Sequence, residues 1–156
     1  MGIFDLFKRP KVPFDVIIAA DLGDRKAKAQ LSRAFDKGLT SEEHNQLRWD
    51  AYLPLAGQGD ANAQYWIGFL CSMIKKDAKA AIYWWELSAN QGNVDAMNDL
   101  AHGYSEFVNE ENLSYGPVPL GRDQGQEFYW RKKAAETGDE KSLEKFKLYF
   151  PEYKIY

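Results

Sequence analysis

Hydrophobic residues recur along the chain with the period of an α-helix rather than that of a strand. Ala63, Ile67 and Cys71 are spaced four residues apart, so they fall on one face of a helix. No stretch of useful length shows the alternation of apolar and polar residues that a half-buried strand requires. The pattern therefore predicts an all-α protein.

One phrase of residues occurs four times, and each copy is centred on a glycine. An Ala stands three positions before the Gly, and Asp or Asn follows it directly. A small residue comes four positions after the Gly, and mostly large apolar residues come eight and twelve positions after it. The four centres are Gly23-Asp24, Gly59-Asp60, Gly92-Asn93 and Gly138-Asp139.

Each position in the phrase has a physical role. Gly is the residue that most readily ends a helix in the left-handed conformation. The Asp or Asn after it can cap the next helix by accepting a backbone N–H. Each copy is therefore predicted to be helix, tight turn, helix, with preceding helices over 41–56, 77–91 and 123–137. Pro54 is expected to disturb the last turn of the first of these.

The pattern Ala-Xaa-Xaa-Gly-Asp/Asn-Xaa-Xaa-Ala-Xaa-Xaa-Xaa-Leu, preceded by Asp and then Trp, resembles the Sel1-like repeat, a relative of the tetratricopeptide repeat. The glycine that this family usually carries after the large apolar position is kept only at Gly68. The resemblance implies a right-handed α/α superhelix (solenoid) of about four helix pairs in a single domain, 1–156. Its expected parts are an N-terminal cap (1–22), the repeats (23–150) and a C-terminal tail (151–156).

A stack of such pairs presents a concave groove, the usual binding surface of helical-repeat proteins. The resemblance implies that residues three, six, ten and fourteen positions after each Gly line this groove. Apolar side chains with a polar rim there are typical of a partner site, although flanking helices or the tail could cover them. The expected groove residues are Lys26, Ala29, Arg33 and Lys37 in the first copy, and Tyr65, Phe69, Met73, Asn98, His102 and Glu106 among those of the next two.

The interval between the last two glycines is the longest, and its excess falls in residues 109–122. Two Pro and two Gly within six residues forbid regular structure there. Insertions in repeat proteins project as loops, often on a binding face. This loop either contacts a partner or folds back on its own scaffold. Its candidate contact residues are Glu110, Glu111, Leu113 and Tyr115.

Charge and composition narrow the class of partner. The net charge is −3, and residues 51–122 by themselves carry about −4, so nucleic acid is not expected as a partner. No stretch approaches the ~20 apolar residues of a membrane span, so integral membrane association is not expected. The apolar and basic segment around Phe4 and Phe7 is too short for stable membrane binding and is expected to cap the helical stack. A single cysteine, Cys71, fits the reducing cytoplasm.

The groups that catalysis would need are scarce. His44 and His102 lie in different repeats, and neither has a second His three or four residues away to form a helical metal site. No nucleophile elbow, phosphate loop or dinucleotide fingerprint occurs. Cys71 is expected in the core, as are Trp84, Trp85 and Trp130. The basic run 131–133 is expected to be a solvated face with ion-pair support.

These features favour a non-catalytic module, without metal or cofactor, that binds another protein through its groove and the 109–122 loop. Small Sel1-like proteins resemble bacterial adaptors and toxin-neutralising immunity proteins, so a basic toxin or effector is a candidate partner. The protein is expected to be a monomer or a weak homodimer. One alternative is a scaffold that self-associates through Tyr65, Phe69 and Met73. Another is a hydrolase or a β-lactam binder, as some secreted Sel1-like members are described.

Overall fold

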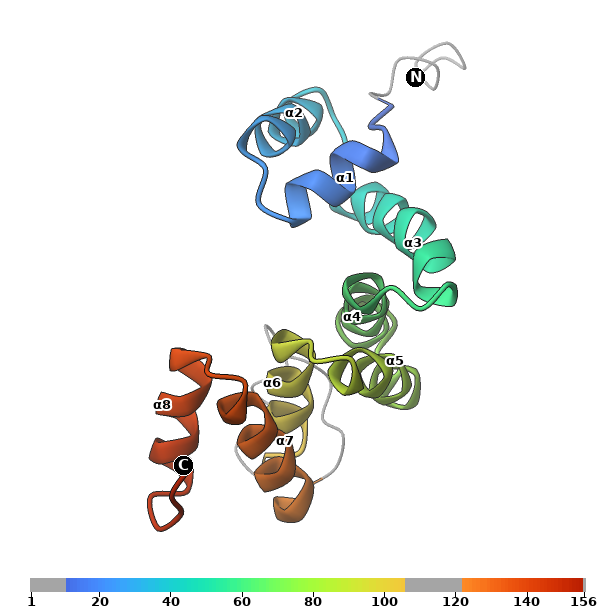
Figure 1. Ribbon diagram of the computed structural model, residues 1–156. Helices are drawn as coiled ribbons and strands as arrows, with labels where there is room; N and C mark the ends of the chain where they lie inside the picture. The colour runs from blue at the N-terminus through green and yellow to red at the C-terminus, as the bar shows by residue number, and fades with distance from the viewer. Residues whose placement is uncertain (1–10, 106–121, 156) are drawn as a thin grey trace. The chain divides into compact units, whose positions relative to one another are not determined.

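The computed structural model describes residues 11–105 and 122–155, and all regular structure within these ranges is helical (Figure 1). The prediction of an all-α protein is confirmed for this part of the chain. Several predicted residues lie outside it: Phe4, Phe7, Glu106, Glu110, Glu111, Leu113 and Tyr115.

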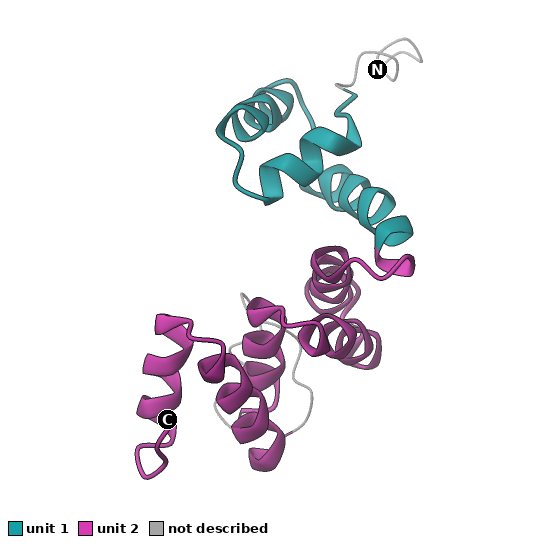
Figure 2. Cartoon of the chain, in the orientation of Figure 1, with its two compact units in different colours: residues 1–55 teal, residues 56–156 magenta. Residues whose placement is uncertain are grey.

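The chain divides into two compact units, residues 1–55 and residues 56–156 (Figure 2). The helices that begin in unit 1 are α1 (Phe14–Asp21), α2 (Arg25–Asp36) and α3 (Ser41–Gly57), the last of which ends just inside unit 2. Unit 2 contains α4 (Ala61–Leu70), the π-helical turn η2 (Cys71–Lys75), α5 (Ala78–Asn90), α6 (Val94–Gly103), α7 (Gln124–Glu136) and α8 (Glu140–Tyr149). Within the segment expected as an end cap, residues 14–21 form α1, which packs on α2.

The four repeated glycines end helices as predicted. Their φ angles lie between 86° and 100°, in the left-handed region. The residue after each glycine caps the next helix by accepting the backbone N–H three positions on. The Asp24 carboxylate accepts from Ala27 at 2.7 Å, and Asp60, Asn93 and Asp139 act in the same way. Local turn chemistry therefore sets every one of these hairpins.

The helix over 41–57 also begins as its sequence predicts. The Thr40 hydroxyl accepts the Glu43 N–H at 3.2 Å, and the Glu43 carboxylate accepts the Thr40 N–H at 2.9 Å, which together form a capping box. The helix continues past Pro54 to Gly57, so the proline does not end it.

The two units differ in the size of the side chains that form their cores. Unit 1 buries a small aliphatic cluster of Val12, Ile17, Ala34 and Leu39 and, apart from this cluster, the ring of Tyr52. Unit 2 buries larger side chains, among them Trp85, Trp130 and Phe146. In unit 2 each helix packs on the next, from α4 through to α8.

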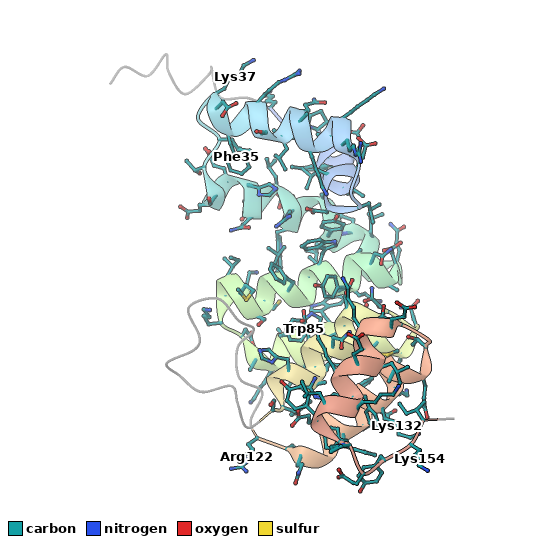
Figure 3. All side chains as sticks on the ribbon, turned by 90° about the vertical axis from the view of Figure 1, so that its left-hand side faces the viewer. Phe35, Lys37, Trp85, Arg122, Lys132 and Lys154 are labelled. Carbon is teal, nitrogen blue, oxygen red and sulfur yellow. The ribbon has the colours of Figure 1, made fainter. Side chains whose placement is uncertain are left out.

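The contact between α4 and α5 is close because Gly68 faces Trp85, whose position is labelled in Figure 3. A Cβ at Gly68 would lie 2.5 Å from Cδ1 of the indole ring, which is too near for any side chain. The single glycine kept from the repeat pattern therefore has a packing role.

Two other residues were expected in the core of unit 2. Cys71 is buried as expected, while Trp84 is only half-buried.

Candidate binding surface

Side chains from α4, α6 and α8 bond directly to one another in unit 2. The Asn98 amide donates to the Ser142 hydroxyl at 2.9 Å, which joins α6 to α8. The Asn93 amide donates to the Asn62 side-chain oxygen at 3.2 Å, which joins the cap of α6 to α4. The Tyr65 hydroxyl donates to the Asp99 carboxylate. We call the face that these residues share the α4–α6–α8 surface.

The predicted groove residues of the second copy form a partly covered aromatic row on α4. Tyr65 and Phe69 are half-buried, and the Trp66 ring lies 5.5 Å, centroid to centroid, from the ring on either side. Met73 lies in η2 and is also half-buried. Tyr153, in the tail that could have covered this row, packs instead against Phe128 at 4.7 Å.

Of the third copy, Asn98 and His102 lie on α6. Asn98 is half-buried and its amide is occupied by Ser142 and by the Val94 carbonyl. His102 is exposed as a residue, but partial burial of its ring lowers its pKa, and the nearby positive charges of Arg131 and Lys145 lower it further. His102 is therefore a neutral hydrogen-bonding group at pH 7.

Asp99 has the most perturbed carboxyl group on this surface. Its pKa is raised to about 7, mainly by burial and further by the neighbouring Asp95 carboxylate. The Tyr65 hydroxyl and the Lys145 ammonium oppose that rise without cancelling it. Asp99 is thus close to half-protonated at neutral pH, and a small change in its surroundings changes its charge.

A buried ion pair lies beside this surface on α7, where the sequence predicted a solvated basic run. Arg131 and Glu127 are each 5% exposed, and the guanidinium donates to the carboxylate at 2.8 Å. The guanidinium also stacks 3.9 Å from the centre of the Tyr149 ring. The expectation of a solvated face is therefore wrong for Arg131. It holds for Lys132, which pairs with Glu136 at the surface (Figure 3).

Three residues of this surface were missed by sequence reasoning. Leu148, on α8, is 75% exposed and stands ten positions after Gly138, as Phe69 stands after Gly59. The same count, applied to the fourth copy, would have found it. Asp99 and Lys145 each stand seven positions after their glycine, a position that the groove rule does not include.

Three other features bear on function in the described residues: the reactivity of the thiol, metal binding and the crossing of a membrane. Burial raises the pKa of the Cys71 thiol, which keeps it protonated and unreactive at pH 7. Within 11–105 and 122–155, no three His, Cys, Asp or Glu side chains gather where they could hold a metal ion. In the same ranges no helix combines the length and the apolar character needed to cross a membrane.

Comparisons of the chain with protein-family models, with curated proteins and with solved structures find no match. A function must therefore be inferred from the α4–α6–α8 surface itself.

Proposed function

We propose that this protein is a non-catalytic, protein-binding module whose α4–α6–α8 surface receives a basic segment of a partner protein. The observation that carries the proposal is the row of half-buried rings of Tyr65, Trp66 and Phe69, whose Tyr65 hydroxyl bonds to the Asp99 carboxyl group on α6. We further propose that its hairpins are Sel1-like repeats stacked as a right-handed superhelix. The identical capped turns at all four glycines support this assignment.

The surface combines two sources of affinity for such a segment. Aromatic rings offer a large contact area at a low cost in side-chain entropy, and they are enriched among the residues that dominate binding energy. A Lys or Arg from the partner would favour the charged form of Asp99 and so lower its pKa. Binding would then release a proton, and affinity would rise as the pH increases from 6 to 8.

The experiment starts from affinity capture with the full chain and continues with titration calorimetry on the captured partner. Asp99→Asn keeps the acceptor for Tyr65 but removes the charge, so it should flatten the pH dependence of binding. Phe69→Asp should weaken binding at least about tenfold. Tyr83→Asp is the matched control, since Tyr83 is a 57% exposed aromatic residue on α5 outside the surface.

Two results would count against the proposal. One is an unchanged set of partners after both Phe69→Asp and deletion of residues 112–120. The other is an affinity that does not change between pH 6 and 8 for the wild-type chain, because the carboxyl of Asp99 would then play no part in binding.

The role that we propose for such binding is that of a bacterial adaptor or of an immunity protein that covers a basic toxin site. The negative charge of residues 51–122, about −4, supports a basic partner. Cys71 is free and buried, which is consistent with a protein that acts in the reducing cytoplasm. If the partner is a toxin, a one-to-one mixture with this chain should abolish its activity, and Phe69→Asp should restore it.

A further inference from the structure

We propose that unit 1 carries a second binding surface, on the α1–α2 hairpin, which binds the anionic headgroups of a membrane. It is separate from the α4–α6–α8 surface and does not depend on a protein partner.

A row of cations runs along one face of α2 and continues to Lys37, the residue just after its end. Lys26, Arg33 and Lys37 follow one another at helical spacings of seven and four, with Gln30 between them, so all four share one face. We call this face the basic stripe, and at 1.5 Å per residue it is about 16 Å long. Its cations are exposed, and within the described residues none of them pairs with a carboxylate. Their charge is therefore available to a ligand.

Two surface hollows lie at opposite ends of the hairpin. Their lining shows that residues of α1, and those just before and after it, lie beside the basic stripe. The first hollow, of about 350 Å³, is lined by Lys11, Val12, Gln30, Arg33, Ala34 and Lys37. Three cations thus surround a space large enough for a phosphate group. The second hollow lies at the Gly23 turn, where Leu22 and Lys26 share the lining.

An exposed apolar side chain accompanies these cations at the second hollow. Leu22, which shares its lining with Lys26, is 64% exposed. Cations flanked by exposed apolar side chains suit a membrane interface, where headgroup attraction and shallow apolar contact act together. A site for single-stranded nucleic acid would instead need stacking rings along a basic groove.

The test is sedimentation of the full chain with vesicles of phosphatidylcholine alone or mixed with phosphatidylglycerol. We expect binding to the mixed vesicles only, weakened by added salt. The variant Arg33→Gln/Lys37→Gln should lower the partition coefficient roughly 30-fold, because each cation near such a surface contributes about fivefold. The control Lys28→Gln/Lys79→Gln removes the same charge from exposed positions outside the basic stripe and outside the residues that line either hollow.

The control separates a local site from overall charge. Equal losses in the two double variants would overturn the proposal, as would equal binding to neutral vesicles. Displacement from the mixed vesicles by an equal concentration of duplex DNA phosphate would overturn it in favour of a general polyanion site. Displacement by millimolar inorganic phosphate would show that the first hollow binds free phosphate rather than a membrane. Far-UV circular dichroism checks that each variant stays folded.

Discussion

Units 1 and 2 use the same turn but hold their helices together differently. In both units a left-handed glycine is followed by an Asp or Asn that caps the next helix. Beyond the turn, unit 1 relies on a small aliphatic core, whereas unit 2 packs large rings against small residues.

A polar network supplements the small core of unit 1. The Asp21 carboxylate, whose side chain is 3% exposed, accepts hydrogen bonds from Arg48 and, at 3.1 Å, from the Tyr52 hydroxyl. These contacts tie the end of α1 to the middle of α3. In unit 2 the tie between α4 and α5 is steric, through Gly68 and Trp85. The contrast shows that a common turn determines how two helices are connected, but not which side chains hold the helices together.

The largest effect is expected at the steric contact of unit 2. Gly68→Ala should lower the free energy of unfolding by about 3 kcal/mol, because the new methyl group must displace the buried Trp85 ring. Chemical denaturation measures the loss, and hydrogen exchange should place it in residues 56–156. The control Gly57→Ala, with open space around its Cβ, should change stability by less than about 1 kcal/mol. Equal effects of the two changes would show that the close contact is absent.

The second-largest effect on stability is expected from the polar network of unit 1. Arg48→Met leaves the Asp21 carboxylate buried with less compensation, which should cost about 2 kcal/mol. Hydrogen exchange should then quicken within residues 11–55. Lys132→Met, which breaks an exposed pair on α7, is the control and should cost less than about 0.5 kcal/mol. If Arg48→Met is as mild as the control, the network does not stabilise unit 1.

The pH dependence of stability should come mainly from Asp99 in unit 2. Its pKa is about 7 in the folded chain, well above that of an unfolded Asp, so the folded state binds more protons between pH 4 and 7. Wild-type stability should therefore fall as the pH rises through that window and level off above it. Asp99→Asn should add roughly 1–3 kcal/mol at pH 8 and little at pH 4. Parallel stability curves for the two proteins would refute the raised pKa.

The smallest effect should be shared by both units, because the caps are the same. Asp24→Ala and Asp60→Ala should each cost about 1 kcal/mol, measured by thermal unfolding. Replacing either residue with Asn, which also caps well, should cost only a few tenths of that. If only one of the two Ala variants lowers stability, the turns of the two units contribute differently to the free energy of unfolding.

Features decided by near neighbours in the chain were predictable from the sequence. The turns, the caps and the start of α3 depend on residues within about four positions of one another, so their chemistry can be recognised directly. The core of unit 2 follows the same rule, since Ala63, Ile67 and Cys71 are all buried as the spacing predicts.

Features decided by distant neighbours were not predictable. Phe35 stands twelve positions after Gly23, where the repeated phrase predicts a core residue, but Ala34 is buried there instead, while Phe35 is 37% exposed and packs its ring on His44. Arg131 is buried because Glu127 and Tyr149 satisfy its guanidinium, which no local pattern indicates. On the candidate surface, the spacing locates Tyr65 and Phe69, but the pKa of Asp99 depends on three separate helices. Partner binding by these residues stays a prediction.

The buried Glu127–Arg131 pair has a consequence for engineering. Counting back from their glycines, Glu127 and Arg131 occupy on α7 the places that Ala81 and Trp85 occupy on α5. Ala101, on α6, likewise matches Gly68 on α4. The triple exchange Ala101→Gly, Glu127→Ala and Arg131→Trp would copy the ring-on-glycine interface into the neighbouring hairpin. If the chain still folds after this exchange, two successive hairpins would share one type of interface, which could be repeated to build longer arrays.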